Sequence, residues 1–146
     1  IFWACLIAAL VLNMSYVAFP SFYPRADFPV TNIHEALVEW TRQIDGSNNT
    51  FPSGHVTFAW LMFIGAFQSM IARKTPGLRS LYLLWAIGIS LSTLVLKQHY
   101  IVDVISGISL AFAAYYMSKP IVRLHMRLVT NDGSGKKINT KYVWYL

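Results

Sequence analysis

Four long segments of the chain are apolar and nearly free of charge: residues 1–21, 52–72, 80–96 and 100–118. Each approaches the roughly 20 residues that a helix needs to cross a bilayer. Only 12% of all residues are charged, whereas soluble domains carry about 25%. We therefore expect an all-α, polytopic transmembrane helical bundle with about four membrane helices.

Between the first two apolar segments, residues 32–45 have the pattern of an amphipathic helix. Its apolar residues recur at helical spacing, at Ile33, Leu37, Trp40 and Ile44. We expect this helix to lie along the membrane interface. Two roles remain open for it: a cap on the bundle, or a lid over entering lipid.

The ends of the chain suggest how it is divided. Ile1 already lies inside an apolar segment, so we expect the chain to be part of a longer protein with helices upstream. After Pro120 the sequence becomes basic and polar. We therefore divide the chain into a membrane-embedded domain, 1–119, and a basic cytoplasmic tail, 120–146.

Charge is distributed unequally between the two sides of this expected bundle. Residues 73–79 and those from 119 onward share one side, where nine basic residues against Asp132 give a net charge of +8. Residues 20–51 and 97–103 share the other, where three basic and five acidic residues give −2. Positive loops stay in the cytoplasm, so the second side should face the periplasm, the exterior or an organelle lumen, across a plasma or inner membrane. The net charge of +6 then reflects topology and anionic lipids, and we expect no nucleic-acid partner.

Two histidines lie at the ends of apolar segments on that second side, and one of them has an acidic neighbour. His99 and Asp103 are four residues apart, so on one helix they would share a face. A carboxylate there can accept a hydrogen bond from the imidazole and fix its tautomer. The other ring nitrogen is then free to attack an electrophile.

The second histidine follows a helix-start pattern, Pro52-Ser53-Gly54-His55. Ser53 and Gly54 would begin a helix, whose unpaired N–H groups and dipole favour an anion such as phosphate. His55 can protonate a departing oxygen, while Lys97 and Arg25 supply positive charge for the phosphate oxygens. The sequence thus contains the groups needed for phosphoryl transfer through a phosphohistidine.

Simpler interpretations of these residues stay open. A single histidine at a helix end is commonly an interfacial side chain, and a single His–Asp pair at this spacing is commonly structural. His and Asp also bind metals, but no third ligand occurs at a recognisable spacing. With Cys5 as the single cysteine, a cysteine metal cluster is excluded. We expect no metal and no cofactor.

Taken in order, the segments FPSGH at 51–55 and KQHYIVD at 97–103 resemble the type 2 phosphatidic acid phosphatase superfamily. The resemblance covers about residues 23–108 and is strongest to the branch similar to inositol phosphorylceramide synthases, which is inositolphosphotransferase-like. It implies a metal-independent helical bundle in which His99 is the nucleophile, Asp103 its orienting partner and His55 the general acid.

The same resemblance assigns phosphate binding to Ser53, Gly54 and Arg25. Two positions depart from the family pattern: Ala18 and Thr93 stand where the family has a lysine and an arginine. Lys97, two residues before His99, is the expected substitute for these cations.

We therefore predict an integral-membrane lipid phosphatase, if water is the acceptor, or a lipid phosphotransferase, if an alcohol is. The expected partners are a lipid phosphate and the surrounding membrane lipids, and the oligomeric state is left open. The alternative function is a catalytically silent membrane protein that uses the same fold to bind lipid phosphate.

Overall fold

A computed structural model describes residues 1–22, 24, 29–45 and 50–130 of the chain. These residues form helices and no strand element, which confirms the predicted all-α class. The helices are α1 (Phe2–Ala18), α2 (Ile33–Asp45), α3 (Gly54–Gln68), α4 (Met70–Lys74), α5 (Pro76–Val95) and α6 (Ile101–Thr130).

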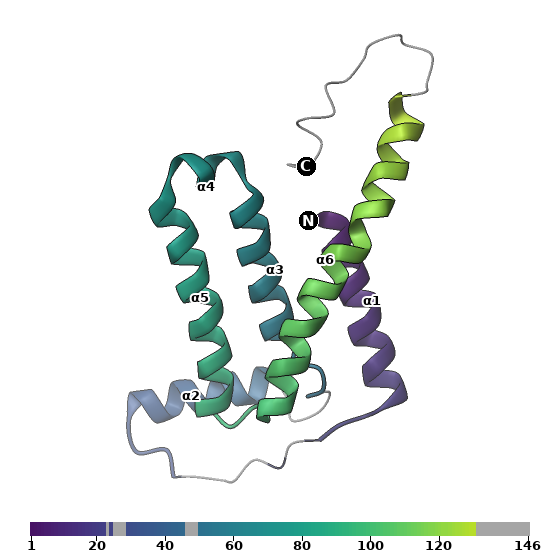
Figure 1. The fold of residues 1–146 in the computed structure, drawn as a ribbon. Helices are drawn as coiled ribbons and strands as arrows, with labels where there is room; N and C mark the ends of the chain where they lie inside the picture. The colour runs from purple at the N-terminus through teal and green to yellow at the C-terminus, as the bar shows by residue number, and fades with distance from the viewer. Residues whose placement is uncertain (23, 25–28, 46–49, 131–146) are drawn as a thin grey trace.

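Helix α3 is the centre of the bundle. It packs against α5 on one side and α6 on another, and α1 packs along α6. Figure 1 shows α3 and α5 as a hairpin closed by the short α4, with α1 and α6 beside it. The starts of α3 and α6 and the end of α5 therefore meet at one end of the molecule.

Small residues allow the helices to approach closely. Ala4 and Ala8 of α1 and Ala111 and Ala114 of α6 are completely buried in one cluster, into which Leu61 of α3 also packs. Alanines spaced three or four residues apart on facing helices bring the backbones together, as is common between membrane helices. The core is thus built mainly by close backbone packing.

Within the part of the chain that the structure describes, two helices, α5 and α6, are long and apolar enough to cross a membrane, over Gly77–Val95 and Ile101–Leu128. The prediction of about four such helices was therefore wrong in number. Helix α3 has 15 residues, or about 22 Å at the usual rise, because Ser69 takes an extended conformation and caps α4 instead. Helix α1, with 17 residues, is also shorter than the roughly 20 that a span requires.

The surfaces of these two helices are strongly apolar. Only 17% of the apolar stretch of α5 and 33% of that of α6 are buried inside the protein, whereas the core helix of a soluble protein would be mostly buried. Leu84 and Val95 of α5 and Ile105 of α6 are examples of exposed large side chains. An apolar surface this extensive favours a lipid environment.

Helix α2 confirms the predicted helix after residue 32, and it lies across the end of the bundle where α3 and α6 begin (Figure 1). Its first turn is a capping box: Glu35 N–H donates to Asn32 Oδ1, and the Glu35 carboxylate accepts from the Thr31 and Asn32 amides. The hydrogen bond from the Thr31 backbone holds the pKa of Glu35 below its usual value. The apolar side chains of Ile33 and Trp40 are exposed.

Helix α6 continues through Pro120 to Thr130. The expected boundary between a membrane domain and a tail at residues 119 and 120 therefore falls inside a helix. Most of the expected tail, residues 131–146, lies outside the described residues.

Candidate active site

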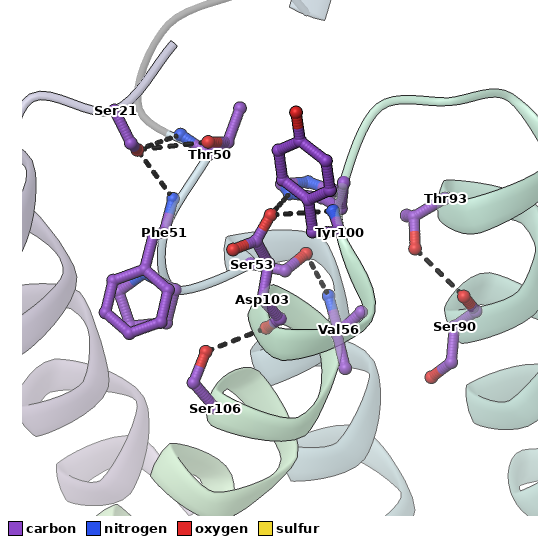
Figure 2. A network of polar contacts seen from close by, with 12 residues as sticks. Ser21, Thr50, Phe51, Ser53, Val56, Ser90, Thr93, Tyr100, Asp103 and Ser106 are labelled. Atoms are coloured by element: carbon purple, nitrogen blue, oxygen red, sulfur yellow. Dashed lines mark hydrogen bonds and ion pairs between the residues drawn. The ribbon is translucent and has the colours of Figure 1, made fainter. Parts of the chain in front are cut away.

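The two predicted histidine segments meet at one end of the bundle. Ser53 and His55 lie at the start of α3, and His99 and Asp103 lie where the turn after α5 leads into α6. Figure 2 shows Ser53 and Asp103 side by side at this junction, with the end of α5 next to them. The structure thus brings together five of the residues selected from the sequence: Ser53, Gly54, His55, His99 and Asp103.

The start of α3 is set by its capping residue. Ser53 has an extended backbone and its hydroxyl oxygen accepts a hydrogen bond from Val56 N–H at 3.5 Å, as an N-cap does. The predicted helix start is therefore confirmed. Ser53 is completely buried, whereas His55, in the first turn of the helix, is exposed. His55 is therefore accessible from outside the protein, whereas Ser53 is not.

His99 lies in the turn before α6, so the expectation that it shares one helix with Asp103 was wrong. The backbone amides of Gln98 and His99 both donate to the Thr93 carbonyl, at 3.0 and 3.2 Å. The Tyr100 amide then donates to Asp103 Oδ2 at 2.8 Å. The Asp103 side chain thus caps the N-terminus of α6 at Tyr100, and the helix begins after it. His99 and Asp103 still meet, because the turn places His99 beside the first turn of the helix.

His99 and Asp103 form a buried pair. His99 Nδ1 lies 3.6 Å from Asp103 Oδ2, and the two residues are 7% and 2% exposed. The distance is longer than a hydrogen bond, as is common at catalytic pairs before substrate binds. Nδ1 faces the carboxylate, and Nε2 is the ring nitrogen that points away from it.

The second imidazole lies next to the first. The rings of His55 and His99 are 6.3 Å apart, centroid to centroid, and inclined by 63°. The two imidazoles are therefore close neighbours. An exposed histidine thus lies beside a buried histidine that has a carboxylate neighbour.

Sequence reasoning missed two residues, Thr57 and Gly107, that join the two segments. Ser53 N–H donates to the Asp103 carbonyl at 3.1 Å, and Thr57 Oγ1 lies 2.8 Å from the Ser53 carbonyl and 3.1 Å from the Gly107 carbonyl. Gly107 makes this approach possible, since a Cβ there would lie 2.8 Å from the Ser53 oxygen. Each missed residue is four positions after a selected one, so helical spacing was the available signal.

The chain entering α3 is held by α1 and the segment after it. Tyr16 donates its hydroxyl to the Pro52 carbonyl at 3.0 Å. Ser21 Oγ accepts from the amides of Thr50 and Phe51, both at 2.9 Å (Figure 2). Sequence reasoning gave none of these polar residues a role, because their partners lie about 30 positions away.

The structure can be compared with the predicted phosphate-binding cations, Lys97 and Arg25, and with the two positions where the family has a cation and this chain does not. Lys97 is exposed in the turn before His99, with a left-handed backbone at φ 52°. Thr93 is buried and donates its hydroxyl to the Ser90 carbonyl of its own helix, beside the site in Figure 2. Ala18 ends α1 and is exposed. Arg25 lies outside the described residues.

The described residues include no group of three or more His, Cys, Asp or Glu side chains that could hold a metal ion.

Comparison with known protein families gives a match. The profile of the PAP2 superfamily matches residues 1–127. Comparison with curated proteins and with solved structures gave no match. Because the profile covers most of the chain, including both histidine segments and the helices that bring them together, the chain belongs to the PAP2 superfamily.

Proposed function

We propose that the chain carries the active site of an integral-membrane lipid phosphatase or phosphotransferase that works through a phosphohistidine, without a metal. Membership of the PAP2 superfamily supports phosphatase or phosphotransferase activity. The observation that carries the mechanism is the cluster in which Asp103 faces His99 Nδ1 and the His55 ring lies next to the His99 ring.

Each residue of this cluster has a defined step. His99 Nε2 attacks the phosphorus of the lipid phosphate, the P–O bond to the leaving group breaks, and His55 gives that oxygen a proton. Asp103 stabilises the positive charge that develops on the His99 ring. Water or an alcohol then attacks phosphorus, the P–N bond breaks, and His55 takes the proton of the attacking hydroxyl.

The acceptor defines the finer function. Water as the acceptor makes the protein a lipid phosphatase, and an alcohol makes it a phosphotransferase. The sequence does not choose between these two acceptors. His55 is exposed at the surface, where either acceptor could approach it.

The proposed site faces away from the cytoplasm, in a plasma, inner or organelle membrane. The end of the bundle opposite His55 carries Arg73 and Lys74 on α4 and Arg123 and Arg127 on α6. Positive charge stays on the cytoplasmic side, which supports this orientation and a cytoplasmic tail beyond α6.

A second candidate function has one observation in its favour. Thr93, which replaces the family's arginine, is buried and turns its hydroxyl to its own helix. It therefore adds neither a charge nor a free donor to a bound phosphate. A site with fewer cations favours a protein that binds lipid phosphate without turning it over.

The deciding experiment measures phosphate release from a panel of lipid phosphates by the purified protein in excess chelator, with and without inositol as alcohol acceptor. Release or transfer in chelator, inhibited by vanadate as a five-coordinate phosphate mimic, supports the proposal. Binding without turnover supports the silent alternative. If chelator abolishes the activity and a divalent ion restores it, metal-assisted hydrolysis would replace the proposed metal-independent mechanism.

His55→Ala should slow departure of the leaving group, because it removes the proton donor. We expect kcat to fall by about 10²- to 10⁴-fold with a lipid phosphate and much less with p-nitrophenyl phosphate, whose leaving group is already acidic. Steady-state rates on the two substrates test this. Equal losses on both would assign His55 another role.

Lys97→Met should weaken catalysis, because the exposed ammonium two residues before His99 offsets phosphate charge. We expect a loss of about 2 kcal/mol in transition-state stabilisation, the effect of losing one charged donor, which is roughly a 30-fold fall in kcat/KM. Methionine keeps a long side chain at the same left-handed backbone position, so the change isolates the charge.

The control for this variant is Lys97→Arg, which should keep most of the activity, and Thr93→Arg should partly restore the methionine variant. An unchanged kcat/KM in Lys97→Met would show that Lys97 does not contact phosphate.

A further inference from the structure

A groove separate from the histidine site lies between α3 and α6. The two helices diverge toward the end of the bundle that carries α4 (Figure 1), and the groove encloses about 270 Å³ in their diverging halves. Its walls are mainly aromatic, formed by Phe63, Phe67, Phe112, Tyr115 and Tyr116. The walls thus suit a long apolar chain.

Two cations lie on the rings of this groove. The guanidinium carbon of Arg79 is 4.6 Å from the centre of the Phe67 ring. Lys119 Nζ is 4.3 and 4.7 Å from the centres of the Tyr116 and Tyr115 rings. Arg79 Nε is buried and has no hydrogen-bond partner within the part of the chain that the structure describes. Charged donors therefore border an apolar groove.

No carboxylate of the surrounding helices neutralises this charge. The sequences of α3, α4 and α5 contain no Asp or Glu, and the single acid of α6, Asp103, lies at the opposite end of the bundle. The same end carries further cations, at Arg73, Lys74 and Arg123. Basic pockets between membrane helices bind anionic lipid headgroups in this setting.

We propose that the groove binds one anionic phospholipid, with an acyl chain against the aromatic rings and the phosphate in contact with Arg79 and Lys119. The proposal rests on α5 and α6 lying in a membrane and does not depend on catalysis at His99. A second copy of this chain fits less well, because its helices α3 to α5 offer no acid to pair with the two cations.

Native mass spectrometry of the delipidated protein in detergent tests this site. It is titrated with phosphatidylglycerol and with phosphatidylcholine of the same acyl chains. We expect one phosphatidylglycerol per chain, bound at least about tenfold more tightly than phosphatidylcholine. Arg79→Gln with Lys119→Gln should weaken phosphatidylglycerol binding roughly thirtyfold, since each basic residue near an anionic lipid contributes about fivefold to the affinity.

The matched control is Arg73→Gln with Lys74→Gln, which removes the same charge at the same end of the bundle from α4, a helix that contributes no residue to the groove. It should change phosphatidylglycerol binding less than about threefold. His99→Ala should bind phosphatidylglycerol like the parent protein, so failure of the catalytic proposal leaves this result intact.

Three results would overturn the proposal: equal binding of the two lipids, equal losses in the two double variants, or protein dimers in place of lipid adducts. Circular dichroism checks folding. If the groove variant does not fold, Lys119→Gln alone decides, with an expected loss of roughly fivefold.

Discussion

His99→Ala is expected to lower turnover by at least about 10⁴-fold, the scale of removing a covalent nucleophile. The reason is geometric: Nδ1 of the His99 imidazole faces the buried Asp103 carboxylate, and in the proposed mechanism Nε2 attacks phosphorus. Initial rates of phosphate release measure the loss. Acid-quenched protein incubated with labelled substrate measures the phosphoenzyme, which should be absent from the variant.

His125→Ala is the matched control, because it makes the same substitution on an exposed residue near the far end of α6. It should leave both turnover and phosphoenzyme unchanged. Thermal denaturation of the three proteins in detergent separates loss of chemistry from loss of fold. A phosphoenzyme that still forms in His99→Ala would assign the nucleophile to another residue.

Gly107→Ala is expected to damage both the fold and the site. An added Cβ would lie 2.8 Å from the Ser53 carbonyl oxygen, and this oxygen belongs to the backbone, so it cannot rotate away. Helix α6 must therefore move from α3, which strains the hydrogen bond from Ser53 N–H to the Asp103 carbonyl. We expect a stability loss of about 1–3 kcal/mol, as for overpacking, and a fall in kcat of about 100-fold from displaced catalytic groups.

Gly88→Ala on α5 is the control for helix propensity, because a Cβ there meets nothing within 4 Å. It should keep activity, and its stability should be equal to or slightly above that of the parent, since alanine favours a helix more than glycine does. Melting temperature and kcat of both variants test the argument. If the two variants behave alike, the contact between α6 and Ser53 does not organise the site.

Some features of the structure could be predicted from short stretches of the sequence. The start of α3 at Gly54 and of α2 at Ile33 follow from capping residues directly before each helix, because a cap satisfies amides only two or three positions away. The all-α class follows from the long apolar segments. The His99–Asp103 pair could also be found, since four residues bring two side chains near each other in a helix or in its capping turn.

The number of long helices and the geometry of the site were decided by tertiary structure. Ser69 divides the second apolar segment into α3 and α4, although the apolar pattern runs through it. Thr57 and Gly107 meet across 50 positions of sequence, and the His55 and His99 rings are neighbours because α3 and α6 pack closely. A sequence fixes which groups can bond to near neighbours, whereas contacts between distant segments form only when helices bury their small residues against each other.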